Sequence, residues 1–334
     1  MTEPTISVVL PAYNAEDHIG AALDSILNQT KYADRLQVLV IDDGSEDQTR
    51  QIVAEIAGQS PCVKLLSNRH TKGPSGARNT GLDHATGNFI AFLDADDLWY
   101  PDHLQKGIDF LLNHAEADVV FYNFDIVELE TNQDMGDWYS IKRYPKQLDS
   151  RELGSGYYLV ESDMANALIE ESFLHLQAMI IRSQTTAEVR FNEEILRSGD
   201  RDYAVSLVIK GNAKFAYSTE KTSVWHRHAQ SLTSNRADNF LNMSLDHIAY
   251  FTHYMKQYGT RPNTREILEK ELISNHVYLS YAYRSRNELK KSFHHLRESF
   301  RYGTTLPQWR ELAKLSIASV IFPVLGKKPG AEAE

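Results

Sequence analysis

The sequence lacks most of what an exported or membrane-spanning protein requires. Its 334 residues include a single cysteine, Cys62, which cannot form a disulfide within the chain. The first residues have neither the basic segment nor the apolar core of a signal peptide. No apolar run approaches the roughly 18 residues that are needed to cross a bilayer. We therefore expect a protein of a reducing, cytoplasmic compartment.

Positive charge is also scarce. The formal net charge is −10, and a phosphate backbone is bound by clustered Lys and Arg, so we expect no nucleic-acid partner. An anionic substrate would need a metal ion or a few placed arginines. With 42% hydrophobic residues the chain can bury a large core, and its length suggests one large domain with a smaller one.

Short apolar segments alternate with helical periodicity in the first hundred residues. They predict four buried strands, at residues 6–10, 36–41, 63–66 and 89–93. Asn14 is the expected N-cap of the first intervening helix, and Ser45 with Gln48 has the spacing of a capping box before the second. This alternation predicts an α/β fold with a doubly wound, mostly parallel sheet and helices on both faces.

The rest of the chain divides into two parts. Residues 121–232 mix strand-like and polar stretches, with strands expected at 178–181 and 214–217 and a helix at 203–209. From residue 238 onward the pattern is helical. Four helices are predicted there, at residues 240–258, 265–284, 288–302 and 308–321.

Polar residues follow three of the four predicted strands. They are PAYN at residues 11–14, DDGS at residues 42–45 and DADD at residues 94–97. In a doubly wound sheet the ligand lies outside the carboxyl ends of the strands. We therefore expect these three segments to meet at one binding site, although they are far apart in the sequence.

Three carboxylates, Asp94, Asp96 and Asp97, lie within four residues. Like charges this close repel unless a cation sits among them, and oxygen ligands favour hard cations such as Mg²⁺ or Mn²⁺. Such an ion would also bridge the two phosphates of a donor. The alternative is a loop whose aspartates cap the following helix.

Other residues near these strand ends suit a nucleotide. A carboxylate after the second strand commonly accepts a hydrogen bond from ribose or base, which would suit Asp42 or Asp43, unless they only form an Asp-Gly turn. Tyr13 either packs against a base or is an ordinary half-buried tyrosine. Residues 73–79 open a helix whose N-terminus attracts anions, and Arg78 there either reaches a phosphate or is a surface arginine.

Four segments together resemble the inverting glycosyltransferases of family 2, which have the GT-A fold. They are SVVLPAYN (7–14), VIDDGS (40–45), GARNTG (76–81) and FLDADD (92–97), in matching order and spacing. The resemblance covers roughly the first hundred residues firmly. It implies transfer of a hexosyl or N-acetylhexosaminyl group from a UDP-sugar to a hydroxyl of a glycan or lipid-linked glycan, as in the biosynthesis of cell-envelope polysaccharides.

The resemblance also implies roles for individual residues. Donor binding falls to Ala12, Tyr13, Asp42, Asp43, Arg78, Asp94 and Ala95. Asp96 would be the main ligand of a divalent metal, Mn²⁺ or Mg²⁺, and His228 in the segment WHRH (225–228) would touch the metal or the diphosphate. The catalytic base falls at Asp200, where Gly199 replaces the glutamate of the family's Glu-Asp pair, and Asp202 is the alternative base.

The resemblance suggests a catalytic GT-A domain at residues 1–232, a helical region at 233–326 and a frayed tail at 327–334. Two other functions compete with catalysis of sugar transfer. One is a catalytically inactive GT-A module that binds sugar nucleotides, to which Gly199 points. The other is a sugar nucleotidyltransferase, for which the loop after the first strand lacks a glycine-rich basic segment.

The C-terminal stretch 309–325 is apolar and is flanked by the basic residues Arg310, Lys314, Lys327 and Lys328. It is too short to span a bilayer. Either it lies in the interface of an anionic membrane, with peripheral contact at the inner face, or it packs on its own domain.

Overall fold

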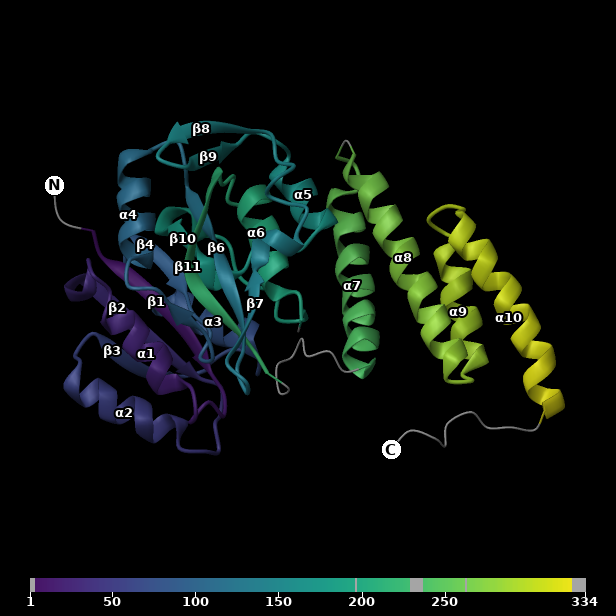
Figure 1. The fold of residues 1–334 in the computed structure, drawn as a ribbon, viewed down its shortest axis with the longest axis horizontal. Helices are drawn as coiled ribbons and strands as arrows, with labels where there is room; N and C mark the ends of the chain where they lie inside the picture. Colours follow the sequence, from purple (N-terminus) through teal and green to yellow (C-terminus); the bar gives the residue numbers. More distant parts are fainter. Residues whose placement is uncertain (1–3, 196, 229–236, 262, 326–334) are drawn as a thin grey trace. The chain divides into compact units, whose positions relative to one another are not determined.

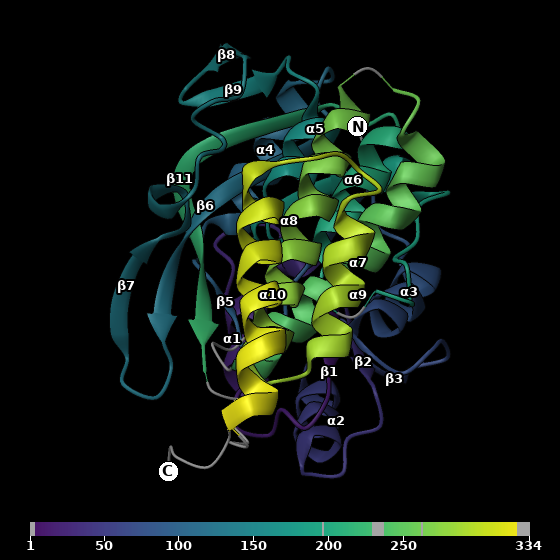
Figure 2. The ribbon, with the colours of Figure 1, turned by 90° about the vertical axis from the view of Figure 1, so that its right-hand side faces the viewer.

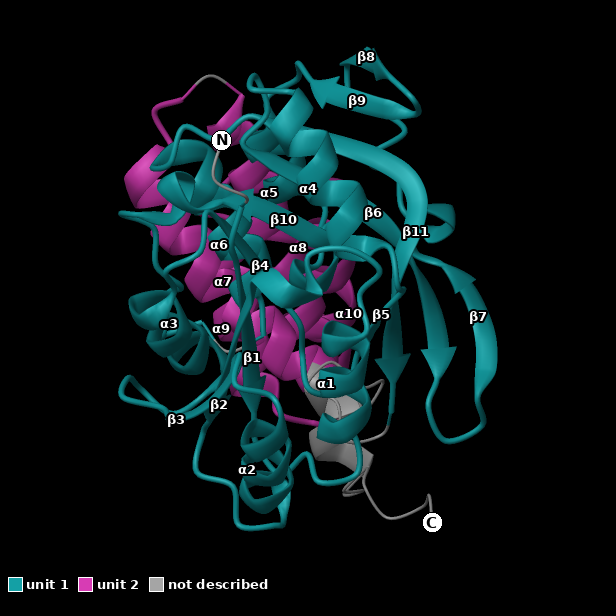
Figure 3. Ribbon diagram, turned by 90° about the vertical axis from the view of Figure 1, so that its left-hand side faces the viewer, with its two compact units in different colours: residues 1–231 teal, residues 232–334 magenta. Residues whose placement is uncertain are grey.

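A computed structural model describes residues 4–195, 197–228, 237–261 and 263–325. The chain forms two compact units, the N-terminal unit of residues 1–231 and the C-terminal unit of residues 232–334 (Figure 3). The expected tail at 327–334 lies outside the described residues, as do the side chains of residues 320–325.

The N-terminal unit is built on one mixed sheet (Figure 1). Its main path runs β3-β2-β1-β4-β10-β6-β11-β9-β8, with β5 paired to β11 and β7 paired to β6. The strands are β1 (Ile6–Ala12), β2 (Leu36–Asp42), β3 (Val63–Ser67), β4 (Phe89–Phe92), β5 (Leu98–Trp99), β6 (Val119–Glu128), β7 (Gln133–Asp137), β8 (Ser150–Gly154), β9 (Tyr157–Val160), β10 (Met179–Arg182) and β11 (Phe215–Arg227). The four N-terminal strands are parallel, as the sequence predicts.

Helices cover both faces of this sheet, which confirms the predicted doubly wound architecture. They are α1 (Ile19–Leu27), α2 (Thr49–Gln59), α3 (Pro74–His84), α4 (His103–Asn113), α5 (Met164–Glu170) and α6 (Gly199–Ile209), with short 3₁₀ turns η1 (Ala33–Arg35), η2 (Trp138–Ile141), η3 (Leu176–Ala178) and η4 (Ser183–Thr186). Successive side chains of β1 point to opposite faces of the sheet. Val8 and Leu10 join the core with α1, whereas Val9 lies against α3.

The loops after β1 and β2 differ from the prediction. Asn14 does not cap α1, which begins at Ile19, and Ser45 does not cap α2, which begins at Thr49. Instead the Asn14 side chain accepts the amide of Glu46 at 2.9 Å, and the Ser45 hydroxyl accepts the amide of Asn14 at 3.0 Å. The two residues therefore fasten the two loops to each other at the carboxyl edge of the sheet.

The C-terminal unit is helical, as predicted. It contains α7 (Ala237–Tyr258), α8 (Thr264–Ser285), α9 (Leu289–Ser299) and α10 (Leu306–Leu325). Successive helices pack side by side (Figure 2), and an ion pair between Arg284 and Glu311 at 2.7 Å joins α8 to α10. None of the helices in the described ranges combines the length and the apolarity needed to cross a membrane.

Candidate active site

The three predicted polar segments are neighbours at one edge of the sheet. β1 pairs in parallel with β2 on one side and with β4 on the other. Their carboxyl ends therefore place residues 11–14, 42–45 and 94–97 side by side. β1 continues through Pro11 to Ala12, two residues beyond the predicted end, and Ala12 accepts the amide of Asp43 at 2.9 Å.

The loop after β1 presents an aromatic face. Tyr13 is 49% exposed, and the Nζ of Lys72 lies 4.4 Å from the centroid of its ring. Asp43 lies in the same region and is fixed there, because its carboxylate accepts hydrogen bonds from the side-chain amide of Asn68 at 2.7 Å and the backbone amide of Gly73 at 2.8 Å. An exposed tyrosine beside a cation and a fixed carboxylate provides both a stacking surface and a hydrogen-bond acceptor for a base.

Asp42 is engaged within the protein. It is buried, and its carboxylate accepts the amide of Ser45 and pairs with Arg50 at 2.7 Å. Burial alone would raise the pKa of Asp42, but these hydrogen bonds and the Arg50 charge outweigh it and hold the pKa below its usual value. This carboxylate shapes the loop that presents Asp43.

Two glycines bring α3 close to its neighbours. A Cβ at Gly81 would lie 2.3 Å from the Val9 side chain, and a Cβ at Gly76 would lie 1.9 Å from the Thr71 carbonyl oxygen. Neither position has room for a side chain. This close packing places Arg78, which lies between the two glycines, in the interior with 4% exposure.

Arg78 joins two acidic residues that are distant in the sequence. One guanidinium nitrogen donates to Asp94 at 2.6 Å and the other to Asp200 at 3.1 Å. Burial disfavours the charge on Arg78, but the two carboxylates outweigh burial and raise its pKa. Burial, reinforced by the charges of Asp200 and Asp96, also raises the pKa of Asp94, although Arg78 opposes this.

The aspartate segment after β4 is fastened to the end of β11. Asp97 is buried and accepts the backbone amide of His226 at 2.9 Å, and the His226 ring donates to the carbonyl oxygen of Asp96 at 2.6 Å. Burial and the neighbouring charges of Asp96 and Asp94 raise the pKa of Asp97 well above its usual value. Asp97 thus holds the segment in place, a role that its sequence position does not reveal.

Asp96 and His228 form the remaining polar pair. The Nε2 of His228 lies 2.9 Å from Oδ2 of Asp96, and the hydrogen bond to this carboxylate raises the pKa of His228. Within the described ranges, no three His, Cys, Asp or Glu side chains converge as a metal site. An oxygen and a nitrogen donor nevertheless fit Mg²⁺ or Mn²⁺ at a nucleotide site, where one or two protein ligands act together with substrate phosphates and water.

Asp200 and Asp202 both lie in the first turn of α6, whose N-terminus favours negative charge. Asp202 is buried at 3% exposure, whereas the Asp200 side chain keeps 30% of its surface exposed and contacts Arg78. Of the two candidate bases, Asp200 is therefore the one with both solvent access and a place beside Asp94.

Sequence reasoning missed Asn79. Its side-chain amide donates to the Phe191 carbonyl at 3.0 Å and to Glu193 at 2.8 Å, and its oxygen accepts the Phe191 amide at 2.8 Å. The segment before α6 is thereby attached to α3. The only signal was that Asn79 follows Arg78 in the segment GARNTG.

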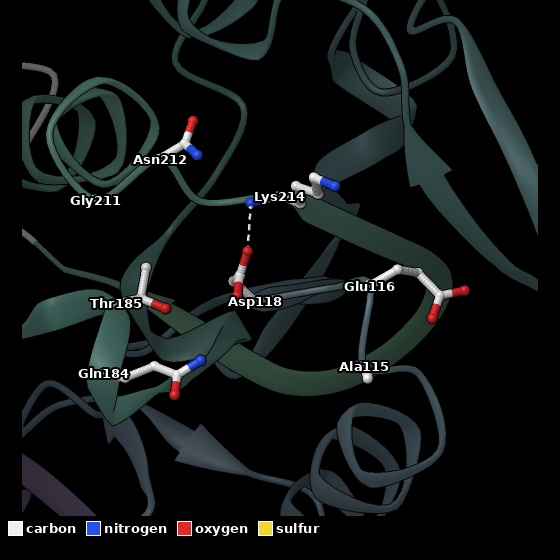
Figure 4. A pocket seen from close by; sticks show the side chains of 8 residues that line it. All are labelled: Ala115, Glu116, Asp118, Gln184, Thr185, Gly211, Asn212 and Lys214. Atoms are coloured by element: carbon white, nitrogen blue, oxygen red, sulfur yellow. Dashed lines mark hydrogen bonds between the residues drawn. The ribbon is translucent and has the colours of Figure 1, made fainter.

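A separate polar pocket of about 370 Å³ lies near the starts of β6 and β11 (Figure 4). It is lined by Ala115, Glu116, Asp118, Gln184, Thr185, Gly211, Asn212 and Lys214. β6 and β11 are parallel to each other and β6 runs parallel to β4 across β10. This pocket is therefore at the opposite edge of the sheet from Asp94 and is not part of the site.

Comparison with known proteins agrees with this geometry. The model of the glycosyl transferase family 2 matches residues 7–161. Over 127 residues the chain is 42% identical to UDP-Glc:alpha-D-GlcNAc-diphosphoundecaprenol beta-1,3-glucosyltransferase WfgD of Escherichia coli. The matched region covers 38% of this chain and 48% of that protein. The chain thus spans about half the length of this relative.

Two solved structures show the same fold. S. aureus TarS in complex with UDP-GlcNAc has a TM-score of 0.55 and 17% identity, with 90% of this chain and 93% of that chain covered. The mannosyltransferase PcManGT of Pyrobaculum calidifontis, in complex with GDP-Man and Mn²⁺, has a TM-score of 0.56 and 19% identity, with 98% and 83% covered. The family that the four segments suggest is matched over residues 7–161, and the predicted GT-A fold is confirmed: this part of the chain is a glycosyl transferase family 2 segment within a GT-A fold.

Proposed function

We propose that this protein transfers a sugar from a UDP-sugar to a hydroxyl of a glycan or lipid-linked glycan, with inversion at the anomeric carbon. The contact of Arg78 with both Asp94 and Asp200 carries the proposal. It joins the donor-binding edge of the sheet to the carboxylate that would accept a proton. A module that only bound sugar nucleotides would not need the second carboxylate at that place.

Several findings support the donor class. The name of WfgD specifies UDP-glucose as its donor, and TarS was solved with UDP-GlcNAc. In this chain Tyr13 presents its ring at the carboxyl edge, with Ala12 and Asp43 beside it. These three residues would hold the uracil and ribose, and Asp94 and Ala95 after β4 would face the sugar.

The proposed chemistry needs a base and a stabilised leaving group. Asp200 would take the proton of the acceptor hydroxyl as that oxygen attacks the anomeric carbon. Arg78 lies beside it and would stabilise negative charge that grows on the leaving diphosphate. A divalent ion held by Asp96 and His228 would supply further positive charge to the diphosphate. One base and no protein nucleophile fit an in-line displacement with inversion.

The base is tested by Asp200→Asn, which keeps the shape and removes the proton acceptor. We expect UDP binding to persist and transfer to fall by about 10²–10⁴, which is the usual contribution of a positioned base. Asp202→Asn is the matched control, because it makes the same change two residues further along α6 on a buried residue. A large loss in Asp202→Asn together with an active Asp200→Asn would refute the assignment.

We further propose peripheral contact of the C-terminal unit with the inner face of a membrane. Three apolar side chains of α10 are more than half exposed, namely Leu306, Trp309 and Ile317. Co-sedimentation of the full chain with anionic vesicles should occur at low salt and weaken in a Trp309→Ser, Ile317→Ser variant. Equal sedimentation of both forms would contradict this contact.

A further inference from the structure

An aromatic cluster next to the site has no role in the chemistry described so far. It consists of Trp138 in η2, His175 just before η3 and Trp225 in β11, and we refer to these three residues as the tryptophan wall. Each ring contacts the other two, with centroid distances of 4.6 Å, 5.6 Å and 5.2 Å and edge-to-face angles of 62° to 79°. The buried ring of Phe124 also contacts Trp138 and His175.

The tryptophan wall adjoins the strand that ends at the aspartate segment, because His175 immediately precedes η3, which packs against β4. Burial lowers the pKa of His175 to about 4, with the charge of Asp200 opposing this change and that of Arg78 adding to it. The imidazole is therefore neutral at neutral pH and within electrostatic range of both residues. Trp225 immediately precedes His226, which holds the aspartate segment of the site. Trp225 and His175 each retain some exposed surface.

Two cations lie over the wall. The Nζ of Lys142 is 4.2 Å from the centroid of a Trp138 ring, and the Cζ of Arg227 is 5.9 Å from a Trp225 ring. No carboxylate of a described residue lies within ion-pair distance of either cation, whereas the nearby Arg143 pairs with Glu170. Glu171 lies near enough to Lys142 to oppose the lowering of its pKa by burial, and Glu128 is the neighbour of Arg227 in the β6–β11 ladder. Neither carboxylate forms an ion pair with these cations, so both cations remain available to an anionic ligand.

Arg227 does not face the proposed diphosphate site. Side chains alternate along a strand, so Trp225 and Arg227 lie on the opposite side of β11 from His226. His226 is bonded to the aspartate segment, and His228 continues on its side toward Asp96. Donor phosphates held at Asp96 would therefore not neutralise Arg227.

We propose that the tryptophan wall with Lys142 and Arg227 is the acceptor subsite, and that the acceptor is a glycan carrying a phosphate or carboxylate group. A sugar ring has apolar C–H faces that pack on aromatic rings, and its hydroxyls then point to the rim. Its anionic group would pair with the guanidinium of Arg227 and the ammonium of Lys142. This proposal rests on the proposed function, because it places the acceptor beside Asp200.

Calorimetry with UDP and Mn²⁺ in excess tests this subsite. The probes are an N-acetylglucosaminyl diphosphate on a short phenoxyalkyl chain, the phenoxyalkyl glycoside without phosphate, and a disaccharide ended by glucuronic acid. We expect at least one anionic probe to bind about tenfold more tightly than the neutral glycoside. The preferred anionic probe identifies the source of the charge, either a lipid diphosphate or the glycan itself.

Variants separate charge from packing. Lys142→Gln and Arg227→Gln should each weaken binding of the anionic probe several-fold and leave binding of the neutral glycoside unchanged. Arg227→Lys should retain most of the affinity for the anionic probe. Trp225→Leu should weaken the binding of both kinds of probe. Arg143→Gln removes a neighbouring charge that is already paired, so it should change neither.

Two outcomes would overturn the proposal: equal binding of neutral and anionic probes, or no binding of either anionic probe to the wild type. An equal loss in Arg143→Gln would overturn the assignment to Lys142 and Arg227. Metal-dependent release of UDP from sugar nucleotides without acceptor is measured alongside. Its absence in the wild type would refute the proposed catalysis, and binding at the tryptophan wall would still be judged on its own.

Discussion

Replacing Arg78 by methionine removes the positive charge that Asp94 and Asp200 share in the structure. The methionine keeps much of the apolar stem, so the main change is the loss of charge and of two hydrogen bonds. Two carboxylates then remain close together in a partly buried site. We expect the variant to fold but to be less stable than the wild type.

The magnitude follows from burial. Removing one partner of a fully buried ion pair costs about 3–5 kcal/mol. Here the arginine is buried, but the side chains of Asp94 and Asp200 keep 36% and 30% of their surface exposed. Water then compensates part of the loss, so we expect about 1–3 kcal/mol at pH 8. For a domain of this size, 2 kcal/mol lowers the melting temperature by about 4–8 °C.

The loss should depend on pH in a defined direction. The pKa of Asp94 is raised in the folded wild type, mainly by burial, although Arg78 opposes the rise. Without Arg78 it rises further. The folded state then holds more protons than the unfolded state between the two pKa values, so stability is lost as the pH increases. The deficit of Arg78→Met should be smaller at pH 5 than at pH 8.

Thermal melts and urea titrations of both proteins at the two pH values provide the measurement. Arg78→Lys keeps the charge without the planar guanidinium, so its stability should lie between those of the wild type and Arg78→Met. Lys31→Gln breaks an exposed pair with Asp109 and should change stability little at either pH, independent of Arg78. An Arg78→Met deficit that is constant with pH, or larger at pH 5, would refute the reasoning.

Three further predictions concern single positions. Asp97→Asn should keep nearly full stability, because the carboxyl already has a strongly raised pKa and an amide oxygen can still accept the backbone bond, whereas Asp97→Ala should cost about 1–3 kcal/mol in urea melts. Gly199→Ala places a Cβ 3.0 Å from the Ser75 hydroxyl, so we expect a loss of less than about 1 kcal/mol and little change in UDP affinity by calorimetry. Burial lowers the pKa values of His276 and His295 to about 4, so the unfolded chain binds protons more readily than the folded one and stability falls as the pH drops from about 6.5 toward 4. A variant with both histidines replaced by asparagine should lose less stability over this pH range in melts followed by circular dichroism.

Much of the fold could be predicted because apolar periodicity reports burial. The four parallel strands and the C-terminal helices appear within a few residues of their predicted positions. The helix starts could not be predicted in the same way. Asn14 and Ser45 have side chains suited to caps, but the two loops lie next to each other in space, and the same groups bond across that gap.

The candidate site was predictable as a set of segments but not as a set of contacts. The sequence places Asp94, Asp96 and Asp97 together without showing that the third is buried under the end of β11. It also marks Arg78 as a candidate phosphate ligand without showing that its guanidinium contacts both Asp94 and Asp200. These differences arise from tertiary contacts between α3, α6 and β11, which no local pattern encodes.

The contacts of Asn79 and Glu193 explain how Asp200 is positioned without the usual acidic neighbour. Glu193 accepts the amide of Thr71 at 3.0 Å and the side chain of Asn79 at 2.8 Å. Burial would raise the pKa of Glu193, but these bonds outweigh it and lower the pKa to about 2, so the residue is ionised and the attachment is charge-assisted. Because this attachment fixes the segment that leads into α6, the distance between Arg78 and Asp200 does not depend on a carboxylate at position 199. The replacement by Gly199 is therefore compatible with a positioned base.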